Sequence, residues 1–146
     1  MKWYLAVLKK YATFKGRAHR TEYWMFILIH FAIFIGLVLL DISLGIGAAV
    51  MPETSTDPNA PAPIILPTIY YLAVLVPALA VGSRRLHDTG RKAWWLLLYV
   101  LPLIHPFGII GPIVLIVFFC FNSQEGDNEY GPNPKTNPEG LTLNKT

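Results

Sequence analysis

The sequence has little charge and almost no cysteine. Only 14% of its 146 residues are Asp, Glu, Lys or Arg, whereas soluble domains carry roughly 25%. The single cysteine, Cys120, excludes an intrachain disulfide and any metal centre that needs several thiolates. The Rossmann fingerprint, the P-loop and the HExxH motif are also absent. These absences argue against an ordinary soluble enzyme, and they leave no reason to expect a cofactor or a metal.

Charge is missing altogether from three long stretches, residues 23–40, 64–83 and 93–121, which contain 18, 20 and 29 residues. About 20 apolar residues span the hydrocarbon core of a bilayer. The first two stretches therefore predict single helical spans, at about residues 23–41 and 64–83. The pattern as a whole predicts an all-α, polytopic membrane helical bundle with about three to four hydrophobic helices.

The third stretch is longer than one crossing and shorter than two. Proline and glycine are concentrated near its centre, at Pro102, Pro106, Gly108, Gly111 and Pro112. Because proline removes a backbone donor and clashes with the preceding turn, a continuous helix is disfavoured there. The sequence predicts either one kinked, tilted span or a broken re-entrant hairpin that turns near residues 105–108. The two alternatives place the C-terminal tail on opposite sides of the membrane.

The first 14 residues carry apolar side chains at helical spacing, with lysines elsewhere on the helical wheel. The apolar positions are Trp3, Tyr4, Val7, Leu8 and Tyr11. This pattern predicts an N-terminal amphipathic helix at the membrane interface. The alternative is a soluble arm that packs on its own protein.

Ten of the twelve basic residues fall in two segments. Six precede the first stretch, namely Lys2, Lys9, Lys10, Lys15, Arg17 and Arg20, and four precede the third, namely Arg84, Arg85, Arg91 and Lys92. By the positive-inside rule, the N-terminus and the segment 84–92 are cytoplasmic. The proline-rich loop 51–63 is then outside the cell.

Two basic segments and one tail motif point to a family. They are residues 14–24 (FKGRAHRTEYW), 83–95 (SRRLHDTGRKAWW) and 128–134 (NEYGPNP). With these elements, the chain resembles the DUF805 family of small bacterial inner-membrane proteins over roughly residues 11–134. The resemblance implies a multi-pass protein of the bacterial inner (plasma) membrane with no assigned molecular function. We expect one membrane domain over residues 1–134 and a flexible polar tail over residues 135–146.

The basic segments also contain acidic residues that would pair with arginine. The candidate ion-pair or anion-binding cluster is Arg17, Arg20, Glu22, Arg84, Arg85, His87, Asp88 and Arg91. We expect Asp88 to pair with Arg17, Arg20 or Arg91, and Glu22 to pair with Arg84 or Arg85. Spare arginines would then hold an anionic lipid headgroup, since their planar forks suit phosphate. The simpler interpretation is anchoring alone, with interfacial tryptophans at Trp3, Trp24, Trp94 and Trp95.

The tail motif predicts a turn, because it combines Asn128, Tyr130, Gly131 and Pro132. If the third stretch is a hairpin, this turn returns to the cytoplasmic face. It would then cap the arginine cluster, with Glu125, Asp127 and Glu129 as partners.

Two of the four histidines, His30 and His105, lie in apolar stretches, where a histidine usually has a polar partner within the bundle. The sequence favours a non-enzymatic inner-membrane protein, without catalytic residues, whose cytoplasmic Arg/His/Asp face binds anionic lipid or a partner protein. The alternative is a small oligomeric transporter or channel component that uses these histidines. We expect a membrane protein partner or a second copy of the chain as possible partners, and no nucleic acid.

Overall fold

The computed structural model describes residues 2–50, 63–104 and 106–135. Every regular element within these ranges is helical. The all-α membrane-helical class predicted from the sequence is therefore confirmed. The proline-rich loop up to residue 62, His105 and the flexible tail expected after residue 135 lie outside the described residues.

Two helices are long and apolar enough to cross a membrane. They are α2, Arg20–Leu44, and α4, Ile65–Asp88. At about 1.5 Å per residue, each exceeds the roughly 30 Å of a bilayer core. The extra length lies at the charged ends, because α2 begins three residues before the uncharged stretch and α4 continues through the basic segment to Asp88.

The chain divides into two compact units. One unit comprises Met1–Phe26 and Val76–Thr146, and the other comprises Ile27–Leu75. We call them the polar unit and the apolar unit, because the charged clusters of α2 and α4 belong to the first.

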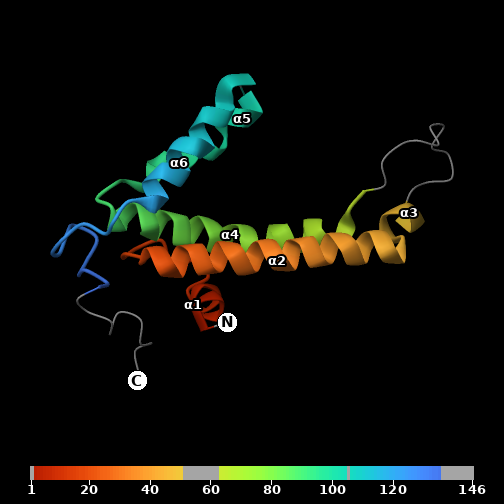
Figure 1. The fold of residues 1–146 in the computed structure, drawn as a ribbon, viewed down its shortest axis with the longest axis horizontal. Coiled ribbons are helices and arrows are strands. Elements are labelled where there is room, and N and C mark those ends of the chain that lie inside the picture. Colours follow the sequence, from red (N-terminus) through yellow and green to blue (C-terminus); the bar gives the residue numbers. More distant parts are fainter. Residues whose placement is uncertain (1, 51–62, 105, 136–146) are drawn as a thin grey trace. The chain divides into compact units, whose positions relative to one another are not determined.

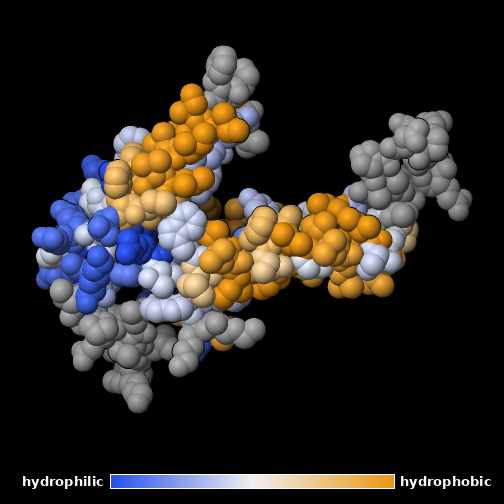
Figure 2. Space-filling view, viewed as in Figure 1, coloured by the Kyte–Doolittle hydropathy of each residue, from blue (hydrophilic) through white to orange (hydrophobic). Residues whose placement is uncertain are grey.

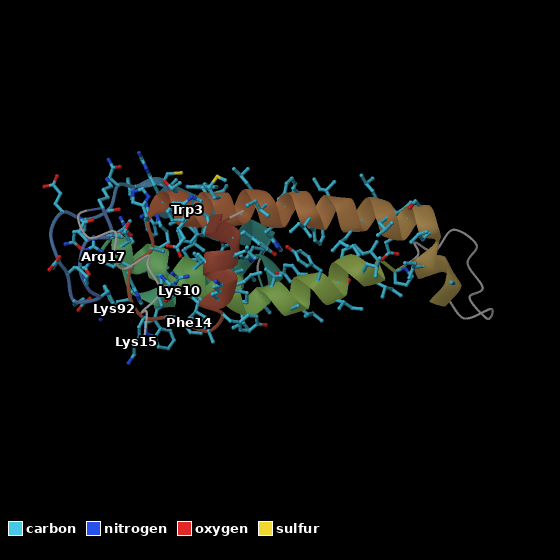
Figure 3. The ribbon with its side chains drawn as sticks, turned by 90° about the horizontal axis from the view of Figure 1, so that it is seen from below. Trp3, Lys10, Phe14, Lys15, Arg17 and Lys92 are labelled. Carbon is cyan, nitrogen blue, oxygen red and sulfur yellow. The ribbon has the colours of Figure 1, made fainter. Side chains whose placement is uncertain are left out.

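Within the polar unit, the helix α1, Lys2–Lys9, packs on the beginning of α2 (Figures 1 and 3). The Tyr4 ring stacks on Phe26 with ring centroids 5.3 Å apart, and Val7 is fully buried. Leu5, by contrast, is exposed. The helix therefore packs on its own protein with one face and keeps apolar surface on another.

The third uncharged stretch is a hairpin of short helices. It comprises the 3-10 helix η1 (Ala93–Tyr99), α5 (Leu101–Ile104), the 3-10 helix η2 (Pro106–Ile109) and α6 (Ile110–Cys120) (Figure 1). Its two arms touch at glycine: a Cβ on Gly111 would lie 2.5 Å from the carbonyl oxygen of Leu98. The two arms pack on each other, so the fold of this stretch is a hairpin and not one continuous kinked helix.

The apolar unit holds two polar contacts between α2 and α4. His30 Nδ1 lies 3.0 Å from the Tyr70 hydroxyl, and the two rings stack. Asp41 Oδ2 accepts hydrogen bonds from the backbone N–H groups of Ile65 and Leu66, both at 2.7 Å. A carboxylate of one helix thus satisfies the free donors at the start of the next. The short helix α3, Ile46–Val50, follows α2.

Candidate functional site

Asp88, the last residue of α4, is the centre of the arginine cluster. Its fully buried carboxylate accepts hydrogen bonds from Arg17 Nε to Oδ1 at 3.1 Å and from Ser123 Oγ to Oδ2 at 2.6 Å. Arg85 Nη1 also pairs with Oδ2. Three segments distant in sequence therefore meet on one carboxylate: the segment after α1, the end of α4 and the segment after α6.

Arg85 binds the C-terminal end of α6. Its Nε and Nη2 donate to the carbonyl oxygen of Phe119 at 3.2 and 3.1 Å, and Nη2 also donates to the carbonyl oxygen of Phe121. The last carbonyls of a helix lack intrahelical partners, and they attract positive charge. Arg85 therefore fastens the returning arm of the hairpin to α4.

Arg17 binds the segment that follows α6, residues 121–135, which is called the tail from here on. The contacts are made to backbone carbonyl groups. Its Nη1 donates to Gly126 at 2.7 Å and to Gly131 at 3.3 Å, and its Nη2 donates to Gln124 at 2.6 Å. The backbone N–H of Gln124 in turn donates to the carbonyl oxygen of Asp88 at 2.9 Å. The tail therefore returns to the end of α4 and covers the cluster.

The tail acids are not the partners that the sequence predicted for the arginines. Glu125, Asp127 and Glu129 are exposed, and none takes part in the three ion pairs of the described residues. Asp127 Oδ1 instead accepts a hydrogen bond from the backbone N–H of Asn133 at 3.1 Å. Backbone carbonyls, which any residue type supplies, replace the expected carboxylates.

Arg84 forms a second ion pair, separate from Asp88. Its Nη1 lies 2.7 Å from Glu22 Oε1, and both side chains are buried. Within the described part of the chain, Arg84 Nε and Nη2 are the buried side-chain nitrogens without a hydrogen-bond partner. Arg84 thus links the first turn of α2 to α4 through one nitrogen, whereas the adjacent Arg85 uses all three.

His87 contacts the predicted turn of the tail. Its ring stacks on Tyr130, with centroids 3.8 Å apart and planes 1° from parallel, and the carbonyl oxygen of His87 accepts a hydrogen bond from Asn128 Nδ2 at 2.9 Å. Paired backbone hydrogen bonds between Asn128 and Gly131 close the turn, with Pro132 after it. His87 Nδ1 lies 3.2 Å from the carbonyl oxygen of Gly16, so this nitrogen carries the hydrogen. The imidazole is a structural contact between two segments.

Two predicted cluster members lie at its edge. Arg20 is exposed and donates to Asn122 Oδ1 at 3.2 Å. The Arg91 guanidinium lies over the Phe118 ring at 4.1 Å and over the Phe121 ring at 4.9 Å. Of the three arginines proposed from the sequence as partners of Asp88, the structure pairs Arg17 with it.

The interfacial tryptophans lie in different surroundings. Trp94 and Trp95 begin the hairpin and are exposed, whereas Trp3 and Trp24 are partly covered. The Trp95 ring also meets Phe118 edge to face at 5.2 Å. Both exposed rings follow the basic segment directly, as expected for side chains that lie between headgroups and acyl chains.

His19 caps the beginning of α2. Its Nδ1 accepts the backbone N–H of Thr21 at 3.1 Å, in the position where an N-cap side chain normally accepts. Burial lowers the pKa of His19 below its usual 6.5, and the Asp88 carboxylate opposes this only in part. The ring is therefore neutral at pH 7 and able to accept.

Sequence reasoning did not single out Ser123 or Asn133, two buried polar residues of the site. Ser123 donates to Asp88, and Asn133 Nδ2 donates to the carbonyl oxygen of Gln124 at 3.3 Å. The one available signal for Ser123 was its place just beyond the third uncharged stretch. Among the described residues, no group of three or more His, Cys, Asp or Glu side chains is arranged to hold a metal ion.

The two basic segments and the tail motif contact each other in the structure, which explains why they occur together. Comparison with known proteins assigns the chain that carries them to a family. The model of the DUF805 family, described as a protein of unknown function, matches residues 11–132. The chain belongs to the DUF805 family. Inner membrane protein YhaH of Escherichia coli strain K12 is 45% identical over 138 residues, 94% of this chain and 100% of YhaH.

A second relative from the same strain has a name of the same kind. Inner membrane protein YhaI is 42% identical over 135 residues, 92% of this chain and 97% of YhaI. No solved structure is significantly similar to the chain. This DUF805 chain is an inner membrane protein of unknown function, as its resemblance to the family implied.

Proposed function

We propose that this DUF805 protein is a non-enzymatic membrane protein whose cytoplasmic surface binds the headgroups of anionic phospholipids. The observation that carries the proposal is the division of its basic residues. Arg17, Arg84 and Arg85 are directed inward, onto Asp88, Glu22 and backbone carbonyls. Lys9, Lys15 and Lys92, by contrast, are exposed.

The exposed lysines lie near aromatic side chains. Lys15 and Lys92 are exposed, and neither takes part in the ion pairs of the described residues. Figure 3 shows Lys10, Phe14 and Lys15, from the segment after α1, on the side of the polar unit where Lys92 also lies. Basic residues beside a membrane gain about 1 kcal/mol each from an anionic leaflet, and aromatic rings favour the interface.

The orientation supports the same proposal. Six basic residues precede the first span, and four lie between the second span and the hairpin, so the positive-inside rule places the N-terminus in the cytoplasm. The cytoplasmic leaflet carries the anionic lipids that attract juxtamembrane lysines. Both basic segments meet this leaflet in the proposed orientation.

Native mass spectrometry tests the lipid preference. The protein is released from nanodiscs that contain phosphatidylglycerol and phosphatidylcholine in equal amounts. We expect the wild type to retain phosphatidylglycerol, and the double variant Lys15→Gln with Lys92→Gln to lose affinity by about fivefold per lysine. Lys135→Gln, which removes an exposed lysine from the tail, is the matched control and should retain the lipid. Equal retention of both lipids, or an unaffected double variant, would contradict the proposal.

The transporter alternative gains no support from the apolar unit. The intramembrane histidine that the structure describes, His30, contacts the Tyr70 hydroxyl and stacks on its ring. Asp41, buried at the far end of α2, caps α4. Both polar groups serve contacts between the two helices, which is the use expected of a satisfied polar side chain in a bundle.

A further inference from the structure

The hairpin formed by residues 93–120 leaves much of its apolar surface without a protein partner. Its exposed side chains include Trp94, Leu97, Ile104, Ile109, Ile110 and Ile113. At the turn, Ile104 is 77% exposed and Ile109 is 66% exposed. Figure 2 shows the hydrophobic colour covering α6, whereas hydrophilic residues gather where α4 ends and the tail lies. Contiguous apolar surface of this kind marks an interaction site.

We infer that this hairpin is re-entrant: it enters the acyl chains from one side of the membrane and turns back without crossing to the other. Its ends establish the first half of this inference. The hairpin begins five residues after Asp88, and behind it the backbone N–H of Gln124 donates to the carbonyl oxygen of Asp88. The chain thus enters and leaves the hairpin at the same end of α4.

The length of the hairpin supports the conclusion that it does not cross the membrane. One arm comprises η1 with 7 residues and α5 with 4, and the other comprises η2 with 4 residues and α6 with 11. At about 2.0 Å per residue in a 3-10 helix and about 1.5 Å per residue in an α-helix, the arms extend about 20 Å and about 25 Å. The hydrocarbon core of a bilayer is about 30 Å thick. A hairpin that starts at the headgroups therefore turns within the hydrocarbon core and does not reach the headgroups of the opposite leaflet, and the exposed Ile104 and Ile109 lie at its deepest point.

The composition of the hairpin suits that depth. Irregular backbone is costly among acyl chains because its polar groups lack partners. Pro102, Pro106 and Pro112 have no N–H group, so three donors are absent from the turn and the adjacent arm. Gly108 allows the arms to close, since a Cβ there would lie 2.2 Å from the carbonyl oxygen of Leu101.

Both ends of the hairpin carry groups suited to the headgroup region. Lys92 precedes it, and Trp94 and Trp95 begin it. At the other end, Arg91 covers Phe118 and Phe121, and Arg85 holds the last carbonyls of α6. In this arrangement the chain crosses the membrane twice, with α2 and α4, and residues 121–135 lie on the same side as the N-terminus.

Cysteine labelling tests the sidedness. In a Cys120→Ser background, single cysteines replace Thr13, Ser43, Ile104 and Glu125, which are all exposed. A membrane-impermeant maleimide is applied to right-side-out and to inside-out vesicles. We expect Thr13→Cys and Glu125→Cys to react from one side, and Ser43→Cys to react from the other. Reaction of Glu125→Cys on the side of Ser43→Cys would show a third crossing and overturn the inference.

A spin label on Ile104→Cys, reconstituted in phosphatidylglycerol and phosphatidylethanolamine vesicles, tests what covers the turn. Oxygen concentrates in the bilayer interior, whereas a polar nickel chelate stays in water. We expect the label to be accessible to oxygen and protected from the nickel chelate. Access by the nickel chelate would place the hairpin in water, and protection from both reagents would mean that protein, such as a second copy, covers it. Either result overturns the inference, and neither depends on lipid headgroup preference.

Discussion

The polar and apolar units join the same two helices through contacts of different kinds. In the apolar unit, α2 and α4 share the contact between His30 and Tyr70 and the cap that Asp41 provides. In the polar unit, two carboxylates and three arginines join α2, α4, the hairpin and the tail. In lipid there is no hydrophobic force between helices, so their association depends on close packing and on hydrogen bonds between helices. Ion pairs and hydrogen bonds between segments distant in sequence therefore hold the polar unit together.

The largest effect is expected from Asp88→Asn, which keeps the shape of the side chain and removes its charge. Arg17 and Arg85 would remain buried without their carboxylate, and breaking a buried pair in this way costs about 3–5 kcal/mol. We expect a strongly lowered midpoint of unfolding in an SDS titration of the purified protein. Glu125→Gln, which removes an exposed charge from the tail, is the control and should leave the midpoint unchanged. Equal midpoints for both variants would show that Asp88 does not hold the polar unit together.

The second-largest effect is expected to differ between the adjacent residues Arg84 and Arg85. Arg85 uses Nε, Nη1 and Nη2, whereas Arg84 uses Nη1 alone. A lysine provides a single ammonium group in place of the fork. Arg85→Lys should therefore lower the unfolding midpoint markedly and expose the hairpin to limited proteolysis near residues 121–124, and Arg84→Lys should be milder on both measures. The reverse order would refute the assignment of the hairpin contact to Arg85.

A smaller effect is expected in the apolar unit from Asp41→Ala. The variant removes the acceptor of two backbone N–H groups at the start of α4, and loss of a helix cap costs about 0.5–2 kcal/mol. Ser43→Ala is the control two residues further on, because Ser43 Oγ contacts only its own helix among the described residues. Hydrogen exchange should become faster in the first turn of α4 and stay unchanged near Asp88. Faster exchange near Asp88 as well would contradict the separation into two units.

The sequence predicted those parts of the structure that side-chain type determines. Two long uncharged stretches indicated α2 and α4. Opposite charges indicated that Asp88 and Glu22 each pair with one of several arginines, and the structure has Arg17 on Asp88 and Arg84 on Glu22. The pair of Arg85 with Asp88 was not among the predicted pairs. These predictions needed only hydrophobicity, charge and helix length. The turn in the tail followed from its asparagine, glycine and proline.

The remainder depended on backbone positions, which carry no signature in the sequence. Arg17 and Arg85 bind carbonyl groups that any residue would present, so the tail acids were the wrong partners to expect. The hairpin could not be distinguished from a kinked span because 29 uncharged residues suit both. Its return became evident only from the contacts of Arg85 and Gln124.

The smallest expected effect concerns pH and the cap of α2. The pKa of His19 is lowered by burial, so the unfolded chain binds a proton before the folded chain does as the pH falls below 6.5. Above pH 6.5 the neutral ring therefore makes its full contribution to the free energy of unfolding. This contribution is lost progressively as the pH falls from 6.5 toward the lower pKa of the folded state. His19→Asn keeps a cap acceptor that does not titrate in this range. As the pH is lowered from about 7.5 to about 5, the unfolding midpoint of the wild type should fall relative to that of His19→Asn. Because the other histidines titrate in both proteins, a constant difference over this range would show that the ring does not act as the acceptor for Thr21.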